Sequence, residues 1–309
     1  MRWEKSRNDS TNWAGRPRPY NIMRDETKKL NDETRKSASG SFIQLPNGTT
    51  HYELGGNESG EVVILVHGFS VPYFMYDPTF KFLTEAGFRV LRYDLFGRGF
   101  SDRPHVDYNI NLFVNQLVHL LDALRITQPV NLIGLSMGGP IASTFTIRHP
   151  ERVKKLTLID PAGAKPISLT PILKAAKIPF VAEAVLGLVG SGALVKSIAK
   201  DFFDPNLVEH FQAQYAVQMQ FKGFKRAILS TIRNGMLESF IHIYEALGKM
   251  DKPVLLFWGR NDNTVPLDHS QALCAAIPNI EFHIIEDCGH IPHYEKPDIV
   301  NPILLEFLK

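Results

Sequence analysis

The sequence contains little cysteine, no marked excess of one charge and no long apolar run. Its 309 residues include two cysteines, Cys274 and Cys288, which excludes a disulfide framework and a zinc site built from Cys and His ligands. The formal net charge is +2, and no cluster of Lys or Arg with interleaved aromatic residues follows the N-terminal segment, which argues against a nucleic-acid partner. Lys174 and Lys177 interrupt the most apolar region, residues 167–194, so no membrane-spanning helix is predicted.

The N-terminal residues 1–39 are polar and have almost no aliphatic periodicity. Such a segment buries too little apolar surface to offset its ordering entropy, so we expect an extension that is mobile or lies on the surface of the domain. A docking arm for a partner or an anionic surface is the functional alternative. Met1 is followed by polar and charged residues without the apolar core of a secretory signal. Because the two thiols are also expected to stay reduced, we expect a cytoplasmic location.

Short apolar runs alternate with helical patterns from residue 41 onward. This alternation predicts an α/β fold, in which an eight-stranded, mostly parallel sheet has helices on both faces. Ligands bind such sheets at loops beyond the carboxyl ends of the strands. The expected strands cover residues 41–45, 49–54, 62–66, 88–93, 130–134, 156–159, 254–258 and 281–285, the first two as a hairpin. The expected helices cover residues 79–85, 110–124, 138–148, 268–276 and 298–308.

Residues 162–245 interrupt the alternation, because their periodicity is helical throughout. We interpret them as a helical cap over the carboxyl end of the sheet, which leaves residues 40–161 and 246–309 as the α/β core. The first part of the cap is strongly apolar, which predicts a hydrophobic acyl pocket or a peripheral contact with lipid; packing within the cap is the alternative. The expected cap helices cover residues 171–176, 180–189, 193–203, 208–220 and 225–237.

A candidate nucleophile, Ser136, lies in the motif Gly134-Leu135-Ser136-Met137-Gly138, where an expected strand turns into an expected helix. A serine that attacks substrate has to stand on a tight, strained turn, and flanking glycines allow the neighbouring backbone to approach. The bare G-x-S-x-G pattern is weak on its own. Its position at a strand-to-helix corner strengthens the interpretation. A glycine-rich helix start with an incidental serine is the structural alternative.

A base and an orienting acid follow Ser136 in the chain. Asp262 comes directly after the strand at 254–258, and His290 follows the strand at 281–285. Serine needs a base to take its proton and a carboxylate to orient that base, so Ser136, Asp262 and His290 are the predicted catalytic triad. Asp160 competes for the role of the acid, and His293 competes for that of the base. Alternatively, Asp262 caps the next helix and His290 is an ordinary loop histidine.

Backbone amides have to meet the oxyanion that forms on the attacked carbonyl. We expect one donor to be the amide of Met137 and the other the amide of Phe69, which Gly68 turns toward the nucleophile. His67 is expected to order this loop rather than to act as an acid or base. Asp94, which ends the strand at 88–93, precedes a glycine-rich loop and is expected to brace it.

These motifs together resemble the α/β-hydrolase superfamily, in the capped branch that contains carboxylesterases, monoacylglycerol lipases and carbon–carbon bond hydrolases. The resemblance covers residues 41–309 and implies the triad and oxyanion donors given above. Relatives that release halide or open epoxides carry Asp at the nucleophile position, so Ser136 argues against both. The motifs are His67-Gly68-Phe69, Asp94 with Gly97 and Gly99, residues 134–139 and 259–266, and Gly289-His290 with Glu295 and Pro297.

The resemblance leads us to expect a serine carboxylic-ester hydrolase, similar to an esterase or lipase, that acts through an acyl-enzyme on hydrophobic acyl esters. It needs no metal or organic cofactor, and its partner is a small-molecule ester. The alternative enzyme hydrolyses a carbon–carbon bond in vinylogous diketones. Such relatives usually carry a tryptophan soon after the catalytic histidine and a glycine-rich loop with proline at the oxyanion strand, where this sequence reads His290-Ile291-Pro292-His293-Tyr294 and Gly68-Phe69-Ser70-Val71. A non-catalytic receptor is the remaining alternative. Protonation of His290 is expected to reduce activity below about pH 6.

Overall fold

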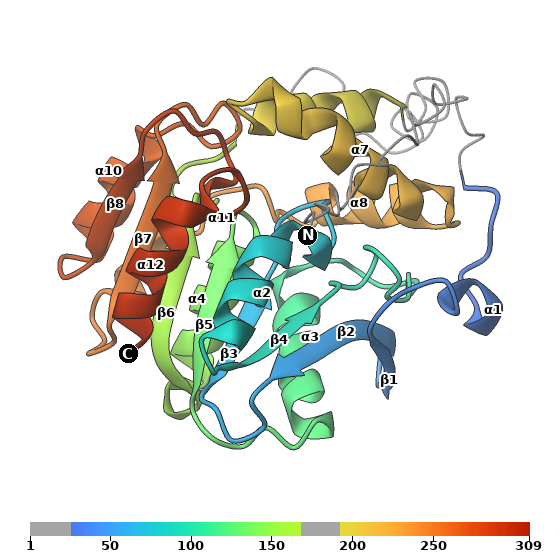
Figure 1. Cartoon of the computed structure of the whole chain (residues 1–309), viewed down its shortest axis with the longest axis horizontal. Helices are drawn as coiled ribbons and strands as arrows, with labels where there is room; N and C mark the ends of the chain where they lie inside the picture. The colour runs from blue at the N-terminus through green and yellow to red at the C-terminus, as the bar shows by residue number, and fades with distance from the viewer. Residues whose placement is uncertain (1–25, 168–191) are drawn as a thin grey trace, which may run out of the picture.

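An eight-stranded sheet forms the centre of the chain (Figure 1). The computed structural model describes residues 26–167 and 192–309. The strand order is β1-β2-β4-β3-β5-β6-β7-β8; β1 and β2 are antiparallel to their neighbours, and the other strands pair in parallel. The strands are β1 (Ser41–Leu45), β2 (Gly48–Gly56), β3 (Val62–Val66), β4 (Arg89–Tyr93), β5 (Val130–Leu135), β6 (Val153–Ile159), β7 (Val254–Gly259) and β8 (Glu281–Ile285). The predicted eight-stranded, mostly parallel sheet is therefore confirmed.

The sheet has an apolar core on each face. Every residue of β3 is buried, and alternate side chains enter opposite cores: Ile64 joins one cluster and Leu65 the other. This explains why the central strands are continuous apolar runs rather than alternating ones. The hairpin that begins the sheet turns at Pro46 and Asn47, as its sequence predicts.

Helices cover both faces of the sheet (Figure 1). One face packs against α3 (Ile110–Ala123), α4 (Gly138–Arg148), α9 (Ile241–Leu247) and α10 (His269–Ala276), and the other against α2 (Asp77–Glu85) and α12 (Pro297–Leu308). All but α9 were predicted, to within two residues at each end. Three short elements complete these layers: η1 (Tyr73–Tyr76), η2 (Pro150–Arg152) and α11 (Pro292–Glu295).

Helical structure also follows β6 and precedes β7, and we call residues 160–253 the insertion. The helices expected at 171–176 and 180–189 lie outside the described residues. Those expected at 208–220 and 225–237 are present, each with a shorter α-helical part. The division into a core and a cap remains a prediction. The remaining insertion elements are η3 (Ile198–Asp201), η4 (Pro205–Leu207), α7 (Val208–Val217), η5 (Gln218–Gln220) and α8 (Phe224–Arg233).

The described part of the N-terminal segment lies against the insertion. The Glu26 carboxylate accepts hydrogen bonds from the amides of Gly223 and Lys225, at 3.0 and 2.6 Å, at the start of α8. The amide of Lys28 donates to the carbonyl of Gln220 at 2.9 Å. A short helix, α1 (Asp32–Arg35), follows it along the chain. Glu26 and Lys28 are therefore held by specific contacts, which agrees with an extension that lies on the surface of the domain.

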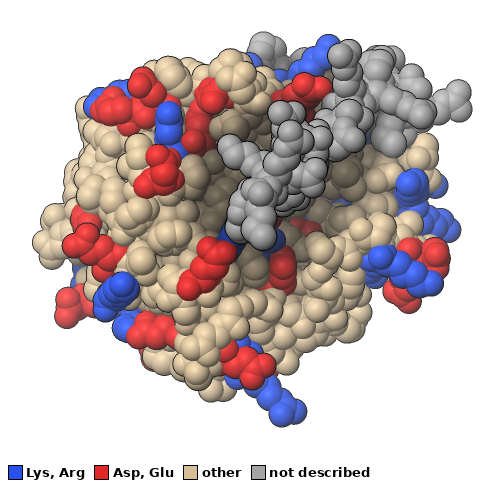
Figure 2. Space-filling view, viewed as in Figure 1, with Lys and Arg blue, Asp and Glu red and all other residues tan. Residues whose placement is uncertain are grey.

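The surface carries both signs of charge. On the face shown in Figure 2, basic and acidic side chains are interspersed rather than gathered into one patch. Among the described residues, no helix combines the length and the apolar content that crossing a bilayer requires.

Candidate active site

Ser136 occupies the corner between β5 and α4. Its φ angle of 51° lies in the left-handed region, which is strained for a residue with a side chain. The corner is fixed to the end of β6, because the Ser136 amide donates to the carbonyl of Ile159 at 2.9 Å and its carbonyl accepts from Ala162 at 3.0 Å. The strained conformation that the motif predicts for a nucleophile is therefore present.

Glycines flank this corner because the backbone packs closely there. A Cβ atom at Gly134 would lie 2.4 Å from the carbonyl oxygen of Gly138, and one at Gly138 would lie 2.2 Å from that of Val66. The first contact would push the start of α4 away from β5, and the second would push it away from β3. The two glycines thus allow α4 to begin directly above the sheet, with Ser136 at its edge.

Asp262 and His290 are joined by a short hydrogen bond. The Nδ1 atom of His290 lies 2.6 Å from Oδ2 of Asp262, and both side chains are buried. The other carboxylate oxygen of Asp262 accepts from the amides of Thr264 and Val265, at 2.7 and 2.9 Å. These amides fix the carboxylate. Because Nδ1 is bonded to Asp262, Nε2 is the nitrogen of His290 that has no hydrogen-bond partner among the described residues.

Charges near His290 favour its protonated form. Burial alone would lower the pKa of His290, but the charge and hydrogen bond of Asp262, together with the charge of Asp201, raise it above the ordinary value. Asp201, in η3 of the insertion, also binds this region directly. Its carboxylate accepts from the hydroxyl of Thr264 at 2.5 Å, and its carbonyl accepts from the amide of His290 at 2.8 Å.

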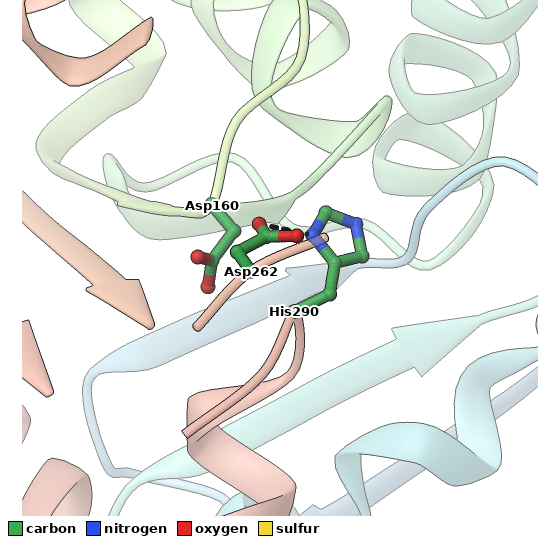
Figure 3. A group of neighbouring side chains, drawn as sticks. All are labelled: Asp160, Asp262 and His290. Atoms are coloured by element: carbon green, nitrogen blue, oxygen red, sulfur yellow. Dashed lines mark hydrogen bonds and ion pairs between the residues drawn. The ribbon is translucent and has the colours of Figure 1, made fainter. Parts of the chain in front are cut away.

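Asp160 lies next to Asp262, on the side away from His290 (Figure 3). Its Oδ1 accepts from the amide of Gly259 at 2.8 Å, and its buried Oδ2 has no hydrogen-bond partner among the described residues. Burial, and then the charge of Asp262, raise the pKa of Asp160 well above its usual range. The arrangement favours Asp262 as the acid that orients His290, with Asp160 as a neutral neighbour.

Asp160, Asp262 and His290 also form the only group in the described part of the chain whose ligand atoms lie close enough together to hold a metal ion, all within 4.8 Å. Nδ1 of His290 is already bonded to Asp262, and Asp262 accepts two amide hydrogens as well. We therefore interpret the group as an acid–base system rather than a ligand set.

The two expected oxyanion donors are available. Within the described residues, neither the amide of Phe69 nor that of Met137 donates a hydrogen bond to the protein. Phe69 belongs to the segment after β3, residues 67–71, which we call the oxyanion loop. It lies against the nucleophile, since a Cβ atom at Gly68 would be 3.7 Å from Oγ of Ser136. Two unused amides beside a serine fit the stabilisation of an oxyanion.

The two competing histidines have structural surroundings. Nε2 of His67 accepts from the amide of Leu95 at 2.9 Å, and its Nδ1 lies 2.9 Å from the carbonyl of Gly68, so the ring orders the oxyanion loop. Burial lowers its pKa to about 4. His293 packs against Tyr76 with ring centroids 4.7 Å apart, and burial, with the charge of His290, lowers its pKa to about 3. Neither ring pairs with a carboxylate in the way that His290 does.

Asp94 has the bracing contacts that the sequence predicts. Its carboxylate accepts from the amides of Tyr73 and Phe100, at 3.0 and 2.9 Å. Nδ1 of His51 lies 2.7 Å from the same group, and Nε2 of His51 lies 2.6 Å from the carbonyl of Ser39. Burial would lower the pKa of His51, but Asp94 outweighs it and raises the pKa.

Two acidic residues near the site were missed by sequence reasoning as functional candidates. Asp201 lies in a region predicted only as helix. Glu295 was noted only as part of the family pattern, although its carboxylate accepts from the amides of Gly289, Phe203 and Asp204, at 2.7, 2.8 and 2.5 Å. Glu295 therefore ties the insertion to the loop that carries His290. Its place five residues after the histidine was the one available signal.

Ser136 and His290 line the same pocket, which has a volume of about 250 Å³. Its walls come from the oxyanion loop, the insertion and the loops after β7 and β8. Among the described residues that line it, Lys200 is the only lysine or arginine, and Asp201 the only carboxylate. The apolar lining residues include Phe69, Val71, Met75, Ile167, Leu194, Ile198, Phe211, Leu237 and Ile291.

Comparisons with known proteins agree on the class of molecule. The model of a family described as "Alpha/beta hydrolase family" matches residues 63–303. A 2-hydroxy-6-oxo-6-phenylhexa-2,4-dienoate hydrolase of Burkholderia cepacia is 30% identical, covering 89% of this chain and 98% of the relative. A 2-hydroxy-6-oxononadienedioate/2-hydroxy-6-oxononatrienedioate hydrolase of Comamonas testosteroni has the same identity and coverage.

A solved structure is also similar. The meta-cleavage product hydrolase from Pseudomonas fluorescens IP01 superposes with a TM-score of 0.72 at 26% identity, covering 87% of this chain and 97% of that one. The similarity therefore extends over nearly the whole length of each of these proteins.

Proposed function

Since this chain belongs to the alpha/beta hydrolase family, we propose that it is a serine hydrolase that cleaves a carbon–carbon bond beside a ketone in 2-hydroxy-6-oxo-dienoate substrates. The observation that carries the hydrolase assignment is the 2.6 Å pairing of His290 with Asp262 in the pocket that Ser136 lines. The substrate class is inferred from the names of the relatives. It is the alternative considered from the sequence, and the relatives support it better than ester hydrolysis.

The chemistry follows from the positions of the side chains. Oγ of Ser136 attacks the substrate carbonyl while Nε2 of His290 accepts its proton, and Asp262 stabilises the imidazolium. The amides of Phe69 and Met137 donate to the oxyanion. As the tetrahedral intermediate collapses, the bond to the leaving group breaks and His290 returns the proton to the leaving atom, which is carbon in a dienoate. Water, deprotonated by His290, then attacks the acyl-enzyme and releases a carboxylic acid.

The pocket offers each end of such a substrate a suitable surface. A dienoate carries a carboxylate, and Lys200 is the lining cation that could pair with it. The group on the other side of the ketone would contact the apolar lining residues, such as Ile198 and Phe211. The carboxylate of Asp201 sets a limit, since a substrate anion placed beside it would be repelled.

Ester hydrolysis is the second candidate, because two features of the pocket favour a neutral substrate. The lining is mainly apolar, and its one described carboxylate, Asp201, would repel a substrate anion. In addition, the residues that follow His290 include no tryptophan, which carbon–carbon bond hydrolases usually carry soon after the catalytic histidine. The triad and the oxyanion donors would act in the same way. Only the leaving atom would differ, an alkoxide oxygen in place of carbon.

One set of assays separates these activities. The full chain is incubated with 2-hydroxy-6-oxo-6-phenylhexa-2,4-dienoate, whose chromophore disappears on cleavage, and with p-nitrophenyl esters of increasing acyl length. We expect kcat/KM for the dienoate to exceed that for every ester, and Ser136→Ala to reduce turnover by about 10⁴-fold or more. Turnover of esters alone would establish the second candidate. No turnover of either, with no labelling of Ser136 by a fluorophosphonate, would refute both.

A further inference from the structure

Two consecutive carbonyl groups of the oxyanion loop are held by side chains from different parts of the chain. Nε of Arg98 donates to the carbonyl of Phe69 at 2.8 Å, and Nε2 of Gln218 donates to that of Ser70 at 2.7 Å. Arg98 is 0% exposed and Gln218 is 2% exposed, so water does not compete for these bonds. The bonds fix the two peptide groups that follow the amide of Phe69, and with them the direction of that amide.

Arg98 is a buried cation whose hydrogen-bond partners are all neutral. Besides Phe69, its guanidinium donates to the carbonyl of Phe96 at 3.2 Å and to the hydroxyl of Thr231, in α8 of the insertion, at 2.9 Å. Among the described residues no carboxylate lies within ion-pair distance of it. Burying an unpaired charge is costly, and an apolar side chain could fill the same space. An apolar residue could not, however, donate hydrogen bonds to the acceptors that Arg98 holds in place.

Gln218 uses both ends of its amide. Its Oε1 accepts from the amide of Gly99 at 2.9 Å, while its Nε2 donates to Ser70. Because one partner is an N–H group and the other a carbonyl, the orientation of the side-chain amide is determined. Gln218 lies in η5, so the insertion is bonded directly to the oxyanion loop. Arg98 and Gly99 are adjacent, and the two holding contacts therefore form one unit.

We infer that Arg98 and Gln218 are positioning residues that hold the amide of Phe69 in the direction required to meet the oxyanion, and that the insertion thereby takes part in catalysis. The inference rests on the proposed function, because it needs the Phe69 amide to be an oxyanion donor. Neither side chain contacts substrate in this scheme. They act through the loop backbone.

Kinetics of Arg98→Lys and Gln218→Met test the inference on whichever substrate the wild type turns over. Lysine keeps the charge, but its N–H donors share one nitrogen and cannot reach the three acceptors that separate guanidinium nitrogens reach; methionine keeps the volume of glutamine without its amide. We expect kcat to fall by about 10-fold to 100-fold with KM within about twofold, because loss of a whole oxyanion donor costs about 100-fold to 1000-fold. The matched controls are Gln220→Met, since the side chain of Gln220, also in η5, donates to the carbonyl of Val217 and not to the oxyanion loop, and Arg152→Lys, since Arg152 binds Ile126 and Asp122 at the amino end of β6.

Inhibition by a short aliphatic trifluoromethyl ketone gives a readout that lost stability would not change. Its serine adduct carries the oxyanion, so its inhibition constant should rise in proportion to the loss of kcat/KM in both variants and stay constant in the controls. Unchanged kcat, or an unchanged inhibition constant, in Gln218→Met would overturn the inference, even if Arg98→Lys does not fold. If a fluorophosphonate fails to label Ser136 in the wild type, the proposed function itself fails.

Discussion

The carbonyl of Asp201 accepts a 2.8 Å hydrogen bond from the amide of His290, which joins the insertion to the loop that carries the candidate base. Glu295 adds to this connection, because one of its carboxylate oxygens accepts from the amides of Phe203 and Asp204 and the other accepts from that of Gly289. The position of His290 therefore depends on residues of the insertion as well as on the sheet.

Replacement of this carboxylate should weaken both stability and turnover. In Glu295→Gln an amide NH₂ group would face backbone N–H donors, so we expect the free energy of unfolding to fall by about 2–4 kcal/mol and kcat to fall with it. Denaturant unfolding and steady-state kinetics measure the two effects. Glu286→Gln is the control, since Glu286 is exposed and should leave both quantities unchanged. Equal behaviour of the two variants would show that Glu295 holds nothing in place.

The pH dependence of activity should reflect the raised pKa of His290. The neutral imidazole is the active base, so activity is lost as the pH falls through this pKa. Because Asp262 and Asp201 outweigh the effect of burial, the acid limb of kcat/KM should lie above the ordinary histidine value of 6.5, higher than the sequence alone suggested. Asp201→Asn should move the limb toward lower pH. A rate that does not change between pH 5 and 8 would exclude His290 as the base.

Asp160 should behave as a neutral carboxylic acid. Asparagine is its neutral counterpart and can still accept from the amide of Gly259, so Asp160→Asn should keep kcat within about threefold of the wild type. It should also leave the acid limb in place, because no charge near His290 is removed. In contrast, Asp262→Asn should lower kcat by about 10⁴-fold. A fall in the acid-limb pKa of Asp160→Asn would mean that Asp160 is ionised.

His51 should stabilise the fold more strongly at low pH. Its pKa is raised in the folded state, so its contribution is complete below the unfolded value of 6.5 and is lost as the pH rises through the folded value. We expect the free energy of unfolding of His51→Gln to lie below that of the wild type by roughly 1–3 kcal/mol at pH 5.5, and by less at pH 8.5. Denaturant titrations at both values measure this. A gap that widens with pH would contradict the assignment.

Much of the sheet could be predicted from the sequence, and the candidate triad could be proposed from it, because both leave local patterns. Buried parallel strands such as β3 are short apolar runs, and a strained nucleophile corner needs small neighbours, as at Gly134 and Gly138. The family and the fold were correctly identified. The preference for the carboxylesterase and monoacylglycerol lipase branch is not what the relatives support, since substrate choice depends on the pocket lining and not on these motifs.

The contacts between the insertion and the loops left no such pattern. Gln218 and Ser70 are far apart in the sequence, and a glutamine in a helical stretch has the same appearance whether it faces solvent or a backbone carbonyl. The sequence pattern likewise did not distinguish Asp201 from an ordinary acidic residue of a helix. Pairing of a side chain with distant backbone depends on how the insertion packs on the sheet, and local periodicity carries no information about that.

The bonds from Gln218 to Ser70 and Gly99 also bear on how such enzymes could be recombined. An engineer who exchanged the insertion with that of a relative to change substrate preference would also replace a support of the oxyanion loop. Such a chimera should bind its new substrate and yet turn it over slowly, unless the segments around Ser70 and Gly99 are transplanted from the same parent. In this chain, exchange of the insertion would therefore change the catalytic rate together with the substrate specificity.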